Sequence, residues 1–250
     1  MNWSFVNNFC RKFGYEIRRW PPSYPIDFGK KETEIIESCK KFTMTSIERM
    51  YDLIQCVRWV IENNIPGGIV ECGVWKGGSM MIVAKTLLDL NCRDIDLFLF
   101  DTFSGMPKPA EEDYSMARSR SASELFEQSK IDEDSSTWNN ISLDNVRKAL
   151  YSTGYPKEKC HFVKGKVEDT IQDQAPNSIS LLRLDTDFYQ STKHELVHLF
   201  PRLSRGGVLI IDDYGNYTGS KKAVDEYFSK NKIPIRLNRI DYSCRTGIKI

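Results

Sequence analysis

The sequence has no surplus of one charge, no long apolar run and no paired cysteine motif. Its 250 residues include 35 Lys+Arg and 34 Asp+Glu, for a net charge of +1 at pH 7. This balance argues against nucleic acid as a partner, because that would require Lys and Arg in excess on one face. The seven cysteines are odd in number and form no CxxC pair, so neither a disulfide scaffold nor a zinc site is expected. The apolar runs are only strand-sized and no signal peptide is visible, so we expect a cytoplasmic protein.

Short apolar runs typical of strands alternate with segments of helical periodicity. With 40% hydrophobic residues, the composition is that of an ordinary globular protein, and the length fits one large α/β domain. Five runs, at residues 69–74, 96–101, 162–165, 180–185 and 206–213, alternate with predicted helices. Two more, at 235–240 and 244–250, are close enough to pair antiparallel. The sequence therefore predicts a doubly wound, seven-stranded, mostly parallel sheet with an antiparallel edge.

Two segments fall outside this alternation. Residues 1–42 read as an amino-terminal helical extension and linker, in which Trp3, Phe5 and Phe9 recur at helical spacing among basic residues. Such a segment can bind peripherally to the inner face of a membrane. Alternatively, it packs on its own domain, on a second subunit or on another partner. Residues 43–250 form the main domain, and the long polar stretch at about 107–140 predicts an inserted lid over the active site.

Acidic residues close the first two predicted strands. In open parallel sheets, ligands bind beyond the carboxyl ends of the strands. Glu71 stands just before a glycine turn, where it would repel phosphate and attract an ammonium group, and Asp101 can accept the hydroxyls of a ribose. An acidic helix cap would explain either residue alone. Together they describe a site for S-adenosylmethionine, whereas the absent GxGxxG motif disfavours a dinucleotide.

Four more carboxylates close the fourth and fifth predicted strands, at Asp185, Asp187, Asp212 and Asp213. Crowded like charges are costly, and a bound divalent cation relieves the repulsion. Ligands that are all oxygen favour Mg²⁺, Mn²⁺ or Ca²⁺ over zinc. The alternative is that these are solvated loop acids, balanced by basic neighbours such as Arg183.

The segments VECGVWKGGS, FDTFSGMPKP, LRLDTDFYQST and LFPRLSRGGVLIIDDYG, with KKAVDEYF, occur in this order. Together they resemble the macrocin O-methyltransferase family, from about Thr43 to the carboxyl-terminal strands. The resemblance implies a Rossmann-like class I methyltransferase that uses S-adenosylmethionine and Mg²⁺ (or Mn²⁺) to methylate a sugar hydroxyl of a glycan or glycosylated natural product. It also suggests a homo-oligomer.

The resemblance also implies roles for individual residues. Asp185, Asp212 and Asp213 would bind the metal, and Asp185 would serve as general base, with Asp187 close to the donor. The residues implied to bind the donor are Thr43 and Met44 closing over it, Glu71, Gly73, Gly78 and Ser79 at its methionine end, Asp101, Phe103 and Ser104 at the ribose, and Gly165 to Val167 at the adenine.

The chain departs from the family at three places: Cys72 replaces a usual Thr, Thr186 replaces a usual Gly, and the insertion diverges after Pro109. These departures leave the acceptor open. A catechol-type small-molecule methyltransferase would use the same donor and metal with an aromatic acceptor, and a non-catalytic scaffold could keep the fold without turnover.

Overall fold

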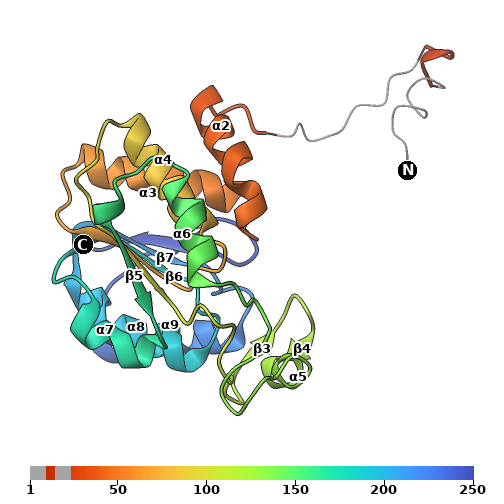
Figure 1. Ribbon diagram of the computed structural model, residues 1–250, viewed down its shortest axis with the longest axis vertical. Coiled ribbons are helices and arrows are strands. Elements are labelled where there is room, and N and C mark those ends of the chain that lie inside the picture. Colours follow the sequence, from red (N-terminus) through yellow and green to blue (C-terminus); the bar gives the residue numbers. More distant parts are fainter. Residues whose placement is uncertain (1–9, 15–23) are drawn as a thin grey trace.

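The computed structural model describes residues 10–14 and 24–250, and a seven-stranded sheet runs through its centre (Figure 1). The strand order is β5-β2-β1-β6-β7-β9-β8. The strands are β1 (Gly68–Cys72), β2 (Leu97–Asp101), β5 (Cys160–Lys164), β6 (Ile179–Leu184), β7 (Leu203–Ile211), β8 (Asn238–Arg239) and β9 (Arg245–Ile248). The first five are parallel, while β9 pairs antiparallel with both β7 and β8. This confirms the predicted sheet.

Two parallel strands must be joined by a segment that crosses back over the sheet, and this segment is usually a helix. Helices therefore cover both faces of the sheet. In Figure 1, α2, α3, α4 and α6 lie on one face and α7, α8 and α9 on the other. The helices are α2 (Lys30–Cys39), α3 (Ile47–Glu62), α4 (Gly78–Asp89), α5 (Ala122–Glu127), α6 (Leu143–Tyr151), α7 (Val167–Gln174), α8 (Tyr189–His198) and α9 (Thr218–Asn231), with 3-10 turns η1 (Lys40–Phe42), η2 (Lys157–Lys159) and η3 (Phe200–Arg202).

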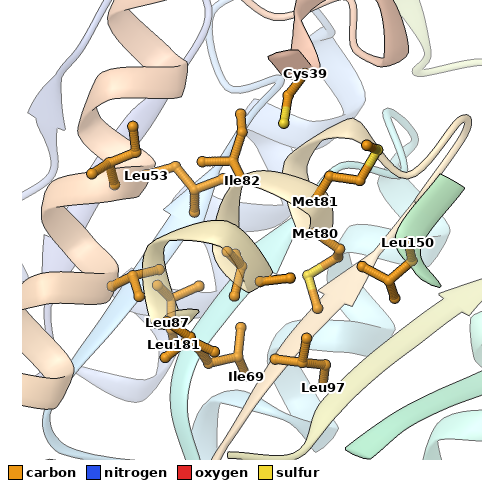
Figure 2. Close-up of a cluster of buried hydrophobic side chains, with 14 of the residues drawn as sticks. Cys39, Leu53, Ile69, Met80, Met81, Ile82, Leu87, Leu97, Leu150 and Leu181 are labelled. Atoms are coloured by element: carbon orange, nitrogen blue, oxygen red, sulfur yellow. The ribbon is translucent and has the colours of Figure 1, made fainter. Parts of the chain in front are cut away.

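Helix α4 is the centre of the larger hydrophobic core. Nine of its twelve residues are buried, because it is covered by helices as well as by the sheet. Figure 2 shows Met80, Ile82 and Leu87 of α4 among side chains from β1, β2, β6 and the covering helices. Since this helix starts directly from the β1 loop, its packing fixes where the loop stands.

Helix α2 belongs to this core as well. Ile36 and Cys39 are fully buried in the same cluster as α3 and α4. Helix α2, which lies before the predicted domain boundary at residue 43, is thus part of the same core, and the boundary itself stays a prediction. The amphipathic segment at residues 3–13 lies mostly outside the described residues, and its membrane or subunit contact stays a prediction. Among the helices of the described ranges, none is long and apolar enough to cross a membrane.

The insertion at residues 107–140 contains a small hairpin, β3 (Tyr114–Ser115) and β4 (Arg120–Ser121), followed by α5. Asp113 anchors it, since this fully buried carboxylate accepts hydrogen bonds from the backbone N–H groups of Ala110 and Tyr189, both at 2.8 Å. Trp138 packs in a separate small cluster with Phe188 and Tyr217. The insertion is thus fastened to the start of α8 and lies beside the carboxyl ends of the strands.

Candidate active site

A cavity of about 310 Å³ lies at the carboxyl ends of β1, β2, β5, β6 and β7. This is the edge where parallel sheets bind ligands. Most of the predicted site residues meet in its wall. The predicted residues that line it are Thr43, Met44, Gly73, Gly78, Ser79, Asp101, Gly165, Val167, Asp185, Asp187, Asp212 and Asp213.

Two glycines let the predicted cofactor loop, residues 73–78 after β1, pass close to its neighbours. Gly73 has a φ of 83°, and a Cβ there would stand 2.0 Å from the carbonyl oxygen of Asp185. Gly78, the first residue of α4, faces the carbonyl oxygen of Phe42, which a Cβ would approach to 2.5 Å. Both positions therefore exclude larger side chains, and the free N–H groups at the start of α4 remain beside the cavity.

Asp101 joins the first two strand-end loops. Its Oδ2 accepts from the N–H groups of Val74 at 2.7 Å and Trp75 at 3.1 Å, and its Oδ1 accepts from the N–H of Phe103 at 2.7 Å. A carboxylate has about four acceptor sites, and these three N–H groups occupy three of them, while the Thr102 hydroxyl lies at 3.5 Å from Oδ1. The contact of Asp101 with the ribose stays a prediction. Phe103 itself is buried in the core and Ser104 is exposed, and neither lines the cavity.

A buried arginine lies under the cavity floor, and sequence reasoning treated it only as a neighbouring charge. Arg183, 4% exposed, donates to Glu71 at 2.8 Å, to Asp185 at 2.6 Å and to Asp212 at 2.6 Å. The sequence does carry a sign of this role: Arg183 stands inside the apolar run SLLRLD, where a charged side chain is buried, and a buried charge needs partners of opposite charge. Glu71, predicted to attract the donor's ammonium group, is instead one of these partners and does not line the cavity. Burial raises the pKa of Glu71 to about 7, although Arg183 opposes the shift.

A second arginine, which sequence reasoning missed, fixes the other side of Asp212. Arg49 of α3 forms an ion pair with Asp212 and another with Asp241, the latter at 2.8 Å. Asp241 also accepts from Ser46, the N-cap of α3, at 2.8 Å. Both oxygens of Asp212 therefore bind arginines, and this network ties the start of α3 to the loop before β9.

Three carboxylates also converge here, of which only Asp185 is paired with an arginine of the described ranges, Arg183. Asp185, Asp187 and Asp213 each place one oxygen within 4.8 Å of the others. Burial, with the charges of Asp212 and Asp213, raises the pKa of Asp185 well above its usual range against the effect of Arg183. Burial also raises the pKa of Asp187 to about 7. The structure thus groups Asp187 with Asp185 and Asp213, and three carboxylates this close repel one another as anions. The predicted metal ligand set of Asp185, Asp212 and Asp213 stays a prediction.

The turn that carries Asp185 and Asp187 is unusual. Asp187 has a φ of 68°, and the N–H of Phe188 donates to the carbonyl of Thr186 at 2.8 Å. The Thr186 hydroxyl donates to Glu195 of α8 at 2.9 Å. Glu195 is fully buried, and burial raises its pKa to about 8. A positive φ at a non-glycine residue costs on the order of 1–3 kcal/mol and persists where the surroundings hold it.

The insertion contributes an aromatic and basic wall, which sequence reasoning did not identify. Trp138 packs edge-on against Phe188 at 6.0 Å between ring centres, and Phe188 packs against Tyr217 at 5.9 Å. Arg118 lies over the Trp138 ring at 5.4 Å. Because Arg118, Trp138 and Tyr217 all line the cavity, they surround the space next to the carboxylates.

Comparison with known proteins assigns this architecture. A family model described as macrocin O-methyltransferase matches residues 30–246. The chain belongs to the macrocin O-methyltransferase family. Demethyldecarbamoylnovobiocin O-methyltransferase of Streptomyces niveus is 34% identical over 203 residues, which cover 80% of this chain and 72% of that protein. Mycinamicin III 3''-O-methyltransferase of Micromonospora griseorubida is 30% identical over 199 residues, covering 80% and 75% of the two chains.

A third member of comparable similarity is 8-demethyl-8-(2,3-dimethoxy-alpha-L-rhamnosyl)-tetracenomycin-C 4'-O-methyltransferase of Streptomyces olivaceus, 30% identical over 80% of this chain and 72% of that protein. The solved structure of the O-methyltransferase NovP has 32% identity and a TM-score of 0.73, covering 83% of this chain and 82% of that one. The protein is therefore an S-adenosylmethionine-dependent O-methyltransferase with a class I Rossmann-like fold, which confirms the prediction.

Proposed function

We propose that this macrocin-type O-methyltransferase methylates a sugar hydroxyl of a glycosylated natural product, assisted by a divalent cation. The tetracenomycin relative is named for a rhamnosyl-bearing substrate, and the novobiocin and mycinamicin relatives are named for other natural products. The observation that carries the metal proposal is the meeting of Asp185, Asp187 and Asp213 in the cavity wall.

The donor set fits a hard divalent cation. Its members offer only carboxylate oxygens, which Mg²⁺ and Mn²⁺ accept readily. Asp213 Oδ2 is buried and has no hydrogen-bond partner among residues 10–14 and 24–250. A buried, unpartnered carboxylate oxygen is expensive, and a cation would satisfy it. We therefore assign Asp185 and Asp213 to the metal, with Asp187 as the third ligand in this arrangement and Asp212 as the alternative implied by the family.

Methyl transfer requires the acceptor hydroxyl to lose its proton as its oxygen attacks the methyl carbon in line with the departing sulfur. When bound, a divalent cation would orient the acceptor and stabilise the developing negative charge. Asp185 takes the proton in this proposal, and Arg183 holds its carboxylate in place.

The cofactor loop and the aromatic wall divide the cavity between donor and acceptor. Gly73, Gly78 and Asp101 offer close backbone approach and a carboxylate, which suit the methionine and ribose parts of the donor. Trp138 and Tyr217 are largely buried but contribute edges to the cavity wall, and Arg118 lies over the Trp138 ring, so this side offers an apolar and basic surface for the acceptor. The carboxylates lie between these two regions, where the acceptor hydroxyl has to meet the methyl group.

The first experiment is a calorimetric titration of chelator-treated protein with S-adenosylhomocysteine, with and without Mg²⁺. We expect binding in both conditions. Asp213→Asn should then lower Mg²⁺-dependent turnover by more than about a hundredfold, since a metal contributes several kcal/mol to the transition state, and should leave S-adenosylhomocysteine binding intact. Asp173→Asn, on the exposed face of α7, is the matched control. Unchanged turnover in Asp213→Asn would remove this residue from the site.

An acceptor screen separates the remaining functions. Turnover with glycosides but not with catechols supports the sugar acceptor, and the reverse pattern supports a catechol-type enzyme. If S-adenosylhomocysteine binds in neither condition, the non-catalytic scaffold becomes the better interpretation.

A further inference from the structure

One buried ionisable side chain, that of Glu195, has no role in the reaction proposed above. It lies in α8 with no exposed surface. One oxygen accepts from Thr186 at 2.9 Å, and the other has no hydrogen-bond partner in the described part of the chain. An apolar residue would fill this position in α8 without the cost of burying a carboxyl group. The interaction with Thr186 is therefore what sets Glu195 apart from a packing residue.

Thr186 stands between two of the carboxylates that meet in the cavity. Its carbonyl accepts from the N–H of Phe188, and the intervening Asp187 has a φ of 68°. A three-residue turn of this kind, with a non-glycine residue at positive φ in its centre, is strained and needs outside support. The Thr186 hydroxyl supplies a contact from the turn to the helix below it.

We infer that Glu195 is a positioning residue: through Thr186 it holds the Asp185–Asp187 turn, and so sets the spacing of the carboxylates that bind the divalent cation. This inference depends on the metal site of the proposed function. Such supports beyond the ligands are known to change metal affinity by about ten- to a hundredfold when removed. The contact is local, so the donor part of the cavity, built on Gly73 and Asp101, is independent of it.

The test measures Mn²⁺ binding to the full chain by electron paramagnetic resonance, in the presence of saturating S-adenosylhomocysteine. Thr186→Val keeps the branched shape and removes the hydroxyl, whereas Thr186→Ser keeps the hydroxyl and serves as the matched control. We expect Thr186→Val to weaken Mn²⁺ binding by about ten- to a hundredfold and Thr186→Ser to bind as the wild type does.

A second variant tests whether weaker Mn²⁺ binding could come from a general loss of structure. Thr186→Val leaves the Glu195 oxygen without its donor, so we add the double variant Thr186→Val with Glu195→Leu, which removes both partners. We expect it to melt near the wild-type temperature, to bind S-adenosylhomocysteine normally, and still to bind Mn²⁺ weakly.

Three outcomes would overturn the inference. If wild-type protein binds Mn²⁺ and Thr186→Val binds it equally well, only the positioning role fails. If Mn²⁺ and S-adenosylhomocysteine affinities fall together, the contact supports the whole cavity rather than the metal ligands. If the wild type itself binds no Mn²⁺, the metal site of the proposed function fails and the positioning role fails with it.

Discussion

Replacing Arg183 with methionine tests whether the buried ion pairs hold the cavity floor together. Arg183 donates to three carboxylates, and two of them, Glu71 and Asp212, are 1% and 4% exposed. Methionine has a similar length but no charge, so the variant leaves these carboxylates buried without their shared cation. Breaking a buried pair in this way costs about 3–5 kcal/mol of unfolding free energy.

The cost should also depend on pH, and its sign follows from the carboxyl groups. Burial already raises the pKa of Glu71 to about 7, and loss of Arg183 raises it further. A carboxyl group whose folded pKa exceeds its unfolded pKa stabilises the fold below the unfolded value, and that stability is lost as pH rises through the folded pKa. The difference between wild type and Arg183→Met should therefore be larger at pH 8 than at pH 5.5.

Urea unfolding in the presence of chelator measures both effects. Lys221→Met is the control, because the Lys221–Asp225 pair is about half exposed on each side and such pairs contribute less than about 1 kcal/mol. A cost for Arg183→Met no larger than that of Lys221→Met, or one that does not change with pH, would refute this reasoning.

Two further predictions concern the other buried acids. Asp187→Asn should raise the Mg²⁺ concentration needed for half-maximal turnover more than Asp212→Asn does, because arginines occupy both oxygens of Asp212; the opposite ranking would restore the ligand set implied by the family. Burial raises the pKa of Glu195 from near 4.5 to about 8, so wild-type stability should fall between these values, by at most ~1.4 kcal/mol per pH unit. Glu195→Gln removes this pH dependence, so the unfolding free energy of the variant, measured with urea, should rise relative to that of the wild type from pH 6 to pH 8. A difference that stays constant over this range would mean that the pKa of Glu195 is not raised by folding.

The fold was predictable because its signals are local and repeated. Apolar runs such as those of β2 and β6 are bounded by glycine or acidic turns, and helical periodicity fills the spaces between them. The sequence predicts residues 1–42 only as a helical extension and linker, without bounds for α2, because the buried positions Ile35, Ile36 and Cys39 follow a proline-rich segment. The order of the strands was not predicted, but ligands of open parallel sheets bind beyond the carboxyl ends of the strands, so the edge that carries the cavity was predicted.

The site was less predictable, because its details depend on contacts between distant residues. The acids themselves were visible at the strand ends, but the partner of each was not. Arg49 lies 163 positions before Asp212, and Trp138 belongs to an insertion without a regular pattern. Glu71 and Asp101 both close strands, yet one pairs with Arg183 under the floor and the other binds the backbone of the cofactor loop.

Asp212 and Asp213 show why the sequence alone does not predict the contacts of each acid. Consecutive residues of an extended strand point to opposite sides, so two adjacent carboxylates after β7 cannot both enter the cavity in the same way while the backbone stays extended. The N–H of Asp212 still donates to Leu184 at 2.9 Å, in continuation of the parallel ladder, and its carboxylate lies toward Arg49 and Arg183. Asp213 then faces Asp185 and Asp187. The two arginines, which come from other elements of the fold, thus decide which of the two adjacent acids joins Asp185 and Asp187. The dipeptide alone does not contain that information.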